Sequence, residues 1–174
     1  CMDKATDSRI EIHAGDITKL DVDAIVNAAN AQLRPGGGVC GAIHRAAGRN
    51  LREACAKIGG CPTGQSVHTD GFDLAAKYVI HTVGPVWHGG GQNEEALLAS
   101  CYRTALKIAK DIGVRSIAFP AISTGVYAFP LQRATEIAVA TVREFLADED
   151  SIDRVVFCVF GSEAEAAYRQ ELGR

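Results

Sequence analysis

Short runs of mostly apolar residues, rich in β-branched side chains, alternate along the chain with longer stretches in which apolar residues recur every three or four positions. The first pattern is typical of strands covered on both faces, and the second of helices with one buried face. The predicted strands are residues 9–13, 24–28, 66–69, 78–83, 116–121 and 154–160. The predicted helices are residues 41–57, 93–112, 130–146 and 162–172. This alternation predicts a three-layer α/β fold, in which helices cover both faces of a central mixed, largely parallel sheet.

Residues that favour helix ends support some of these boundaries. Asn93 is a favourable N-cap for the helix that Gly113 ends. Ser162 and Glu165 have the spacing of a capping box at the start of the last helix. Because ligands of such sheets bind at the carboxyl ends of the strands, the loops that follow the strands are where a functional site is expected.

The chain has 174 residues and no composition break or repeat that marks a linker. This length fits one core, so we predict a single domain over residues 9–174, preceded by an N-terminal tail over residues 1–8. The 18 Lys and Arg residues are outnumbered by 21 acidic residues, which gives a net charge of −3. A broad basic surface for nucleic acid or an anionic membrane is therefore not expected, whereas local anion sites are compatible with this charge.

The six cysteines include no CxxC pair, and a domain of this size needs no disulfide framework, so reduced thiols are expected. The first nine residues lack the apolar segment of a signal peptide, and no run of 18 apolar residues follows. We therefore expect a cytoplasmic protein, and we interpret Cys1, which precedes Met2, as a residue added for expression. The histidines show no metal-ligand spacing with one another or with Cys55 and Cys61, so neither a metal nor a cofactor is expected.

The first candidate loop covers residues 27–41 and contains Asn27, Asn30 and three consecutive glycines at 36–38. It connects a predicted strand to a predicted helix. Successive N–H groups before a helix are unpaired donors at the positive end of the helix dipole, so they favour an anion, and glycine lets the backbone approach a ligand closely. A merely flexible turn is the alternative interpretation.

The second candidate loop covers residues 119–130 and also lies between a strand and a helix. Its small residues expose backbone N–H groups, while Tyr127 and Phe129 offer flat apolar faces, a combination that suits a phosphate beside a sugar or a base. Neither loop has the spacing of a P-loop or of a dinucleotide-binding turn. We predict instead that a diphosphate is held between the two loops.

Five motifs taken together resemble the macrodomain family. They are GDIT at residues 15–18, NAAN at 27–30, the glycine loop and helix start at 36–47, HTVGP at 81–85 and ISTGVY at 122–127. Their order and spacing fit the family from residue 10 to residue 172, and the match is closest to the bacterial branch similar to the MacroD hydrolases. The resemblance implies a cleft for ADP-ribose above a mixed sheet between helices. It also implies hydrolysis of mono-ADP-ribosyl esters on acidic side chains, of O-acetyl-ADP-ribose, or of both.

The resemblance also implies a role for each matching residue. Asp16 would accept a hydrogen bond from the adenine amino group, beside the Ile17 backbone, and Phe160 would pack on the adenine ring; a turn-forming Asp16 and a core Phe160 are the alternatives. Asn30 would bind the distal ribose and hold the reacting carbon and its water in line, while Asn27 would tether the loop backbone. The residues expected along the diphosphate are Ser123, Thr124, Gly125, Val126 and Tyr127, and those expected along the second phosphate and the distal ribose are Gly37, Gly38, Val39 and Cys40.

Cys40 departs from the MacroD pattern, which has Asp after the glycine run and Val. An Asp can orient or deprotonate water, whereas a neutral thiol is a weak substitute. Some viral macrodomains that resemble this chain in having Cys there are hydrolases, in which the substrate's own phosphate or ribose helps to activate water. A nucleophilic Cys40 beside His44, four residues on along the helix, is a further catalytic hypothesis. Its alternative is a Cys40 that only lines the ribose pocket and a His44 that ties the helix to its loop.

Three functions follow from these observations. The first is a hydrolase that acts as a monomer on ADP-ribosylated proteins or O-acetyl-ADP-ribose. The second is a non-catalytic module that binds ADP-ribose or poly-ADP-ribose, because Cys40 replaces the usual Asp. The third is a nicotinamide oxidoreductase, which the missing dinucleotide fingerprint disfavours.

Overall fold

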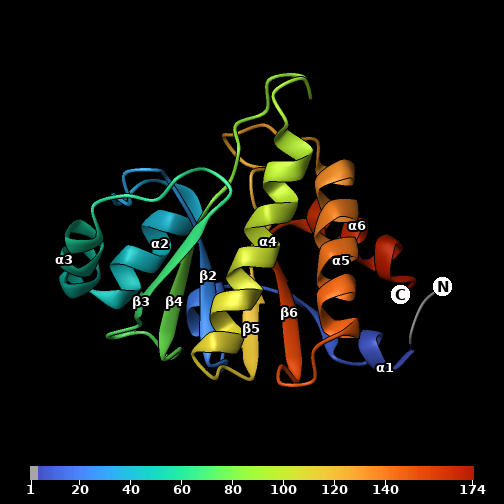
Figure 1. Ribbon diagram of the computed structural model, residues 1–174, viewed down its shortest axis with the longest axis horizontal. Coiled ribbons are helices and arrows are strands. Elements are labelled where there is room, and N and C mark those ends of the chain that lie inside the picture. The colour runs from blue at the N-terminus through green and yellow to red at the C-terminus, as the bar shows by residue number, and fades with distance from the viewer. Residues whose placement is uncertain (1–3) are drawn as a thin grey trace.

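The six predicted strands form one sheet in the computed structural model, which describes residues 4–174 (Figure 1). The interpretation of Cys1 therefore concerns a residue outside the described part of the chain. The helices and strands are α1 (Lys4–Asp7), β1 (Ile10–Ala14), η1 (Ile17–Lys19), β2 (Ala24–Ala29), α2 (Gly38–Ala47), α3 (Arg49–Ile58), β3 (Ser66–Asp70), β4 (Tyr78–Val83), α4 (Glu94–Asp111), β5 (Ser116–Phe119), α5 (Leu131–Ala147), β6 (Arg154–Val159) and α6 (Ser162–Leu172).

The sheet is mixed and largely parallel, as the sequence predicted. Its strand order is β1-β6-β5-β2-β4-β3, and every neighbouring pair is parallel except β3 with β4. The carboxyl ends of five strands therefore meet at one edge of the sheet, which is where loops can build a common site.

Alternate residues along the strands face two separate hydrophobic cores, because side chains of a strand point to opposite faces in turn. Ile117 and Phe119 pack with α4, α5 and α6, whereas Ala118 packs with α2 and α3. On the first face a row of aromatic rings crosses the domain, with centroid distances of 4.9 Å, 6.4 Å and 4.7 Å along Tyr102, Phe119, Phe157 and Tyr168. The predicted three-layer α/β architecture is confirmed. No helix within residues 4–174 is long and apolar enough to cross a membrane.

The predicted helix 41–57 is in fact two helices, α2 and α3, which meet at Gly48. Gly48 has φ 87° and ψ 174°, a conformation that is essentially restricted to glycine. A Cβ at this position would also lie 2.9 Å from Oδ2 of Asp73. The prediction of one helix was wrong because a close contact with a distant loop, invisible in the local apolar spacing, sets the direction of the chain here.

Gly113 follows the end of α4 with a left-handed φ of 78°, as predicted, but the two predicted N-terminal caps make no side-chain capping hydrogen bond. Asn93 has a left-handed φ of 64° and makes no capping hydrogen bond; instead the carboxylate of Glu94 accepts from the N–H groups of His88, Gly90 and Gln92. Ser162 is already the first residue of α6, so the N-cap position falls on Gly161, where the turn after β6 has a φ of 99°. In both cases the geometry of the preceding loop decides which residue reaches the helix end.

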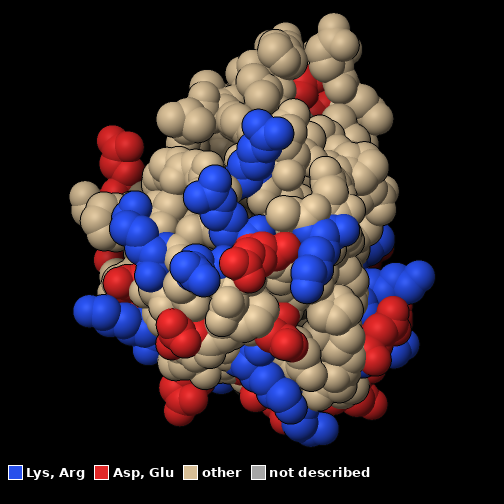
Figure 2. All heavy atoms as spheres, turned by 90° about the vertical axis from the view of Figure 1, so that its left-hand side faces the viewer, with Lys and Arg blue, Asp and Glu red and all other residues tan. Residues whose placement is uncertain are grey.

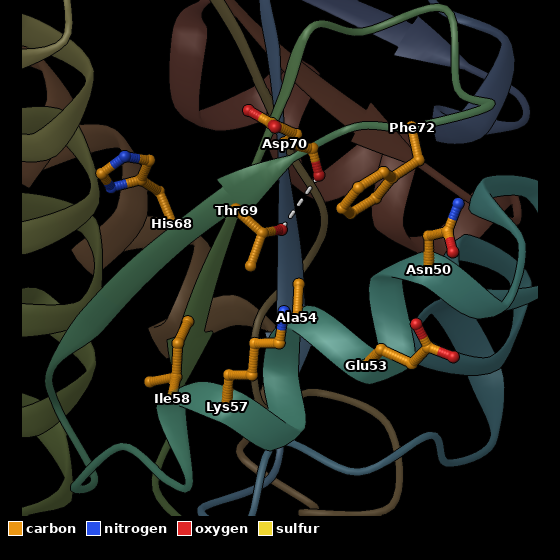
Figure 3. Close-up of a pocket in the computed structure, with 9 residues that line it drawn as sticks. All are labelled: Asn50, Glu53, Ala54, Lys57, Ile58, His68, Thr69, Asp70 and Phe72. Carbon is orange, nitrogen blue, oxygen red and sulfur yellow. Dashed lines mark hydrogen bonds between the residues drawn. The ribbon is translucent and has the colours of Figure 1, made fainter.

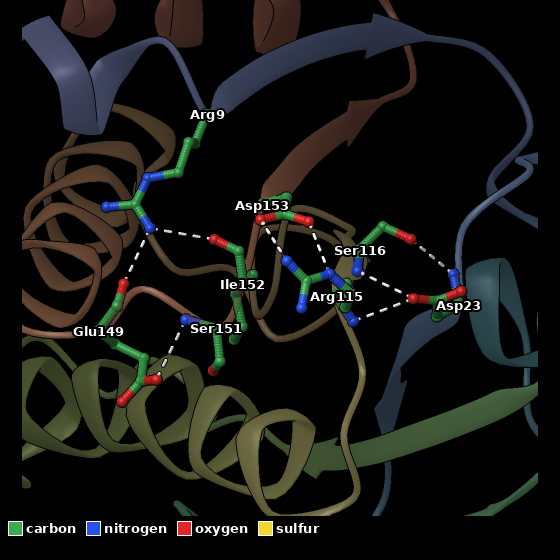
Figure 4. Close-up of polar contacts among 8 residues, drawn as sticks. All are labelled: Arg9, Asp23, Arg115, Ser116, Glu149, Ser151, Ile152 and Asp153. Atoms are coloured by element: carbon green, nitrogen blue, oxygen red, sulfur yellow. Dashed lines mark hydrogen bonds and ion pairs between the residues drawn. The ribbon is translucent and has the colours of Figure 1, made fainter.

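The amino ends of the central strands are fixed by a cluster of polar contacts (Figure 4). Asp23 accepts from the N–H groups of Arg115 and Ser116 and donates its own N–H to the Ser116 hydroxyl. The Arg115 guanidinium forms a two-point contact with the Asp153 carboxylate. These contacts join the starts of β2, β5 and β6, so the edge opposite the carboxyl ends is closed by protein groups.

The described residues of the expected N-terminal tail, 4–8, contact the region around the end of α5. Residues 4–7 form one helical turn, α1, and the Asp7 carboxylate pairs with Arg143 of α5 at 2.8 Å. Arg9 donates to three backbone carbonyl groups at and after the end of α5, at Leu146, Glu149 and Ile152. The sequence missed this attachment because α1 is too short to show an apolar pattern of its own.

Candidate functional site

A cleft of about 840 Å³ lies at the carboxyl ends of the parallel strands. Its walls come from the loops that follow β1, β2, β5 and β6, which are separate in sequence and adjacent in the sheet. The sequence-predicted residues that line it are Asp16, Ile17, Asn30, Gly37, Gly38, Val39, Cys40, Ser123, Thr124, Gly125, Val126, Tyr127 and Phe160. His44 is not among the lining residues. The cleft is within the size range of small-molecule sites in proteins, so these residues can contact one ligand together.

Asp16 both shapes a turn and faces the cleft. One of its carboxylate oxygens, Oδ1, accepts from the Thr18 hydroxyl at 2.7 Å and from the Thr18 N–H at 2.9 Å, which caps η1. These hydrogen bonds, first from the side chain and then from the backbone of Thr18, lower the pKa of the Asp16 carboxyl. The carboxyl is therefore ionised near neutral pH. Its second oxygen has no hydrogen bond within residues 4–174 and can accept one from a ligand.

The side chain of Asn30 holds the loop that leads to the glycines. Its Nδ2 donates to the Arg34 carbonyl oxygen at 2.9 Å, and its Oδ1 accepts from the Arg34 N–H at 3.0 Å. The expectation that Asn27 tethers the backbone of this loop was therefore wrong, because Asn27 is buried and its Nδ2 contacts His81 and the Cys40 thiol instead. An amide group has a second N–H and a second lone pair, so Asn30 keeps one donor and one acceptor for a ligand.

The glycine loop ends in the first turn of α2, which points its free N–H groups at the cleft. The N–H groups of Gly38, Val39 and Cys40 have no acceptor within the described residues, and the helix has no side-chain cap. Unpaired donors at the positive end of a helix attract an anion. A Cβ on Gly37 or Gly38 would meet no protein atom within 4 Å, so these positions leave open space beside the donors.

The loop after β5 presents a second set of free N–H groups. Within residues 4–174 no acceptor pairs with the N–H groups of Thr124, Gly125, Val126 and Tyr127. The loop keeps its shape because the Phe129 N–H donates to the Ser123 carbonyl at 2.9 Å and the Trp87 N–H to the Tyr127 carbonyl at 2.8 Å. Consecutive free N–H groups in a fixed turn form a nest that binds an anion.

Two apolar side chains stand on the rim of the cleft in contact with solvent. Phe160 is 92% exposed and Val126 is 98% exposed. Phe160 directly follows β6 and so lies near Asp16, which follows β1, the neighbouring strand. The core-packing alternative for Phe160 is excluded by its exposure, and its ring is free to lie against the flat face of a ligand.

Cys40 and His44 do not form a catalytic pair. The thiol of Cys40 is 6% exposed; it donates to the Arg34 carbonyl and accepts from Nδ2 of Asn27, both at 3.7 Å. Nδ1 of His44 is buried without a hydrogen-bond partner. Burial, and then the positive charge of Arg52, lower the pKa of His44. Because no hydrogen bond joins His44 to the thiol within the described residues, the imidazole is not placed to activate Cys40 as a nucleophile.

His81 is a functional candidate to which the sequence gave no role. It is fully buried in β4, where its Nδ1 lies 3.0 Å from Nδ2 of Asn27 and its Nε2 lies 3.0 Å from the Thr69 hydroxyl. Burial lowers the pKa of His81 to about 3, with smaller contributions from His44 and His68. A neutral His81 that accepts from Asn27 fixes the amide behind Cys40. The HTVGP motif at residues 81–85 could have indicated a role for His81. The apolar residues before it suggested only a strand in the core.

The sequence also missed the small residues that complete the cleft floor. Among them are Ala28, Ala29, Ala42, Gly84, Ala121 and Ala164. A Cβ on Gly84 would lie 2.2 Å from Oγ of Ser123, so only glycine fits between β4 and the loop after β5. Such residues carry no reactive group, so only their spacing in the sequence could have indicated that they line the cleft.

A second hollow of about 500 Å³ lies between α3 and the edge strand β3 (Figure 3). Its lining includes Asn50, Glu53, Lys57, His68, Asp70 and Phe72. It contains none of the predicted site residues. Within residues 4–174 no group of His, Cys, Asp and Glu side chains is arranged to hold a metal ion. The cleft at the carboxyl ends of the strands is therefore the stronger candidate.

The fold and the position of the cleft define an α/β domain whose ligand site lies at the carboxyl ends of the parallel strands. The chain belongs to the Macro domain family, whose model matches residues 26–138. It is 58% identical over 163 residues to the Macro domain-containing protein CT2219 of Chlorobaculum tepidum. The match covers 92% of this chain and 95% of that protein. It is 52% identical over 160 residues to human ADP-ribose glycohydrolase MACROD2, covering 90% of this chain and 37% of that protein.

A solved structure shares the fold closely. The macrodomain of Trypanosoma brucei, in complex with ADP-ribose, superimposes with a TM-score of 0.89 at 44% sequence identity. The match covers 93% of this chain and 68% of that one. The macrodomain family and fold inferred from the five sequence motifs are therefore confirmed.

Proposed function

We propose that the cleft binds ADP-ribose. The observation that carries this proposal is that two sets of free N–H groups, at residues 38–40 and 124–127, line one cleft. Two anion sites from neighbouring strands β2 and β5 suit the two phosphates of a diphosphate. The ADP-ribose complex of the T. brucei macrodomain supports the same ligand.

The strand order supports one direction for the bound ligand. Asp16 and Phe160 follow β1 and β6, the second N–H set follows β5, and Asn30 with the glycine loop follows β2. Strands are about 4.8 Å apart, so β1 and β2 are separated by about 14 Å across three spacings. An extended ligand would thus have adenine near Asp16, the diphosphate near residues 124–127, and the distal ribose near Asn30.

We further propose that the protein hydrolyses mono-ADP-ribosyl esters on acidic side chains, O-acetyl-ADP-ribose, or both. Water supplies a hydroxyl group and a proton, and the products are the free acid and ADP-ribose. Asn30 retains a donor and an acceptor with which to position the distal ribose and the water. A thiol at position 40 is a weaker base than the carboxylate it replaces, so the ligand's own phosphate or ribose would assist the water. The glycohydrolase MACROD2, at 52% identity, supports a hydrolase.

A second function is favoured by one observation. The Cys40 thiol is hydrogen-bonded to the Arg34 carbonyl and the Asn27 amide, and no carboxylate occupies its place beside the glycine loop. A cleft without a base can bind ADP-ribose and release it unchanged. The alternative is therefore a module that recognises ADP-ribose or poly-ADP-ribose without turnover.

The decisive experiment measures release of ADP-ribose from a protein modified on acidic residues. The parent is compared with Asn30→Ala, Cys40→Ala and Cys40→Asp at matched concentrations, with ADP-ribose affinity of each measured by calorimetry. Release by the parent and by Cys40→Ala, lost in Asn30→Ala, is expected for a hydrolase that needs no carboxylate at position 40. Release by Cys40→Asp alone, with parent affinity intact, would make the protein a binding module. No affinity in the parent would reject the ligand.

The proposal includes a monomer that acts on modified proteins in the cytoplasm. Size-exclusion chromatography with light scattering checks the oligomeric state, and fractionation of the source cells checks the location. A dimer or a membrane-bound pool would contradict these two parts without affecting the ligand.

A further inference from the structure

The segment around the glycine loop has an unusual charge. Residues 34–57 contain five Lys and Arg residues and a single acidic residue, Glu53, in a chain whose net charge is −3. We call the exposed side chains of the five cations the α2–α3 basic surface; they are Arg34, Arg45, Arg49, Arg52 and Lys57. Figure 2 shows the side of the molecule with α3, where Lys and Arg side chains gather with a few acidic side chains between them.

These five cations form no ion pair in the part of the chain that the structure describes. By contrast, Arg115, Arg133 and Arg154 on other parts of the protein are each paired with a carboxylate. Unpaired cations that are adjacent on a surface raise the local potential and attract anions. The local excess therefore remains available to a partner.

The α2–α3 basic surface begins at the rim of the cleft. The backbone of Arg34 is held by Asn30, which lines the cleft. A Cβ added to Gly41 would lie 3.1 Å from Nη1 of Arg45 and 2.4 Å from the Gly36 carbonyl oxygen. The Arg45 guanidinium therefore lies beside the glycine loop. Arg52 lies close enough to His44 of α2 to lower its pKa. The five cations thus extend from the glycine loop along both helices, with the carboxylates of Asp73, at the α2–α3 junction, and Glu53 between them.

We propose that the α2–α3 basic surface binds the acidic polypeptide segment whose Asp or Glu carries the ADP-ribose. This inference rests on the proposed function, in which the distal ribose and its ester lie beside Asn30 and the glycine loop. The polypeptide attached to that ester must leave the cleft next to Arg34 and Arg45. Carboxylates that flank the modified residue would then meet unpaired guanidinium groups.

The composition of the surface favours a polypeptide over a nucleic acid. Sites for single-stranded nucleic acid combine positive charge with aromatic side chains on which bases stack. Residues 34–57 contain no Phe, Tyr or Trp, and Glu53 interrupts the positive charge. Separate guanidinium groups on two helices suit carboxylates spaced along an extended chain.

The test compares two peptides that carry ADP-ribose on the same glutamate through a non-hydrolysable amide. One peptide has Asp and Glu at the flanking positions and the other has Ser and Gly. We expect the parent to bind the acidic peptide about five- to tenfold more tightly at low salt, because several exposed charge pairs each contribute little. This preference should vanish in 0.5 M NaCl and in the combined variant Arg45→Gln, Arg49→Gln and Arg52→Gln.

Matched controls separate the surface from the cleft. Arg103→Gln with Lys107→Gln removes exposed positive charge from α4, on the opposite layer, and should keep the preference. Affinity for free ADP-ribose should be the same in the parent and in both variants. A parent with no preference, or a preference that survives in the Arg45, Arg49 and Arg52 variant, would overturn the proposal.

Two further outcomes are distinguishable. If the parent fails to bind free ADP-ribose, the proposed function is rejected. The α2–α3 basic surface is then tested by NMR titration with the unmodified acidic peptide. Chemical-shift changes that lie outside α2 and α3 would refute binding at this surface. The second outcome concerns a single-stranded RNA oligonucleotide. If this RNA displaces the acidic peptide from the parent and has the higher affinity of the two, the surface is assigned to nucleic acid instead.

Discussion

The side-chain amide of Asn30 is paired at both ends with the backbone of a single residue, Arg34, at 2.9 Å and 3.0 Å. The same asparagine lines the cleft. Loop shape and ligand contact thus depend on one side chain, and a substitution there changes both.

Asn30→Ala should therefore weaken ADP-ribose binding by about 1–3 kcal/mol and speed amide exchange at Arg34, because both hydrogen bonds to the loop are lost. Calorimetry and hydrogen exchange measure the two effects. Gln32→Ala, an exposed change in the same loop, is the control. Unaltered exchange at Arg34 would show that the loop holds its shape without Asn30.

Asp16 is predicted to contribute to ligand binding separately from its turn. Asp16→Ala should cost about 1–3 kcal/mol of ADP-ribose affinity, as for a lost hydrogen bond to a charged group. Thr18→Val removes the hydroxyl that donates to Asp16 in the turn and keeps the carboxylate, so its affinity for ADP-ribose should stay near that of the parent. If calorimetry finds equal losses in both variants, the role of Asp16 is structural.

His81 makes the stability of the fold depend on pH. Its pKa is about 3 in the folded protein and near 6.5 when the chain unfolds, so below pH 6.5 the unfolded state binds more protons. The contribution of His81 to the free energy of unfolding is therefore fully present above pH 6.5 and is lost as the pH is lowered toward 3. Between pH 7 and pH 5 the loss is about 2 kcal/mol.

His81→Gln should remove that part of the pH dependence while keeping amide hydrogen bonds to Asn27 and Thr69. Urea denaturation at pH 7, 6 and 5 measures the effect, and His13→Gln, on the exposed side of β1, serves as the control. A slope for His81→Gln that equals the parent's would refute the assignment.

Glu94 should give a separate response in stronger acid. Burial raises the pKa of its carboxyl, but donation by the N–H groups of His88, Gly90 and Gln92 outweighs burial and lowers the pKa to about 2. The stabilisation is present above pH 4.5, the ordinary pKa, and is lost as the pH falls toward 2. Glu94→Gln should lower Tm at pH 7, and the difference from the parent should shrink between pH 4.5 and 2. Glu163→Gln, exposed on α6, should leave Tm unchanged throughout.

Strands and family were predictable from the sequence because both depend on short patterns. The runs at 24–28 and 78–83 are apolar nearly throughout, and the structure places strands there with at most one residue of difference. The motifs also predicted which residues line the cleft, since the ends of neighbouring strands must meet at one edge.

The errors concern contacts between distant segments. Asn27 was assigned the tethering role of Asn30, although in β2 it shares a face with Ile25 and Ala29, both in the core under α2. Alternation along the strand was the signal that would have placed it inside. The break at Gly48 depends on Asp73, and no local pattern contains that contact.

The position of β1 constrains the order in which the protein can fold. β1 has a single neighbour in the sheet, β6, and its first residue, Ile10, pairs with Val155. During synthesis β1 therefore has no partner in the sheet until β6 has emerged from the ribosome. Arg174 also donates to the Ile10 carbonyl, which joins the segment after α6 to the start of β1. This edge of the sheet cannot form until the residues between β1 and β6 have been synthesised, and β1 stays open to chaperones or to misfolding during that time.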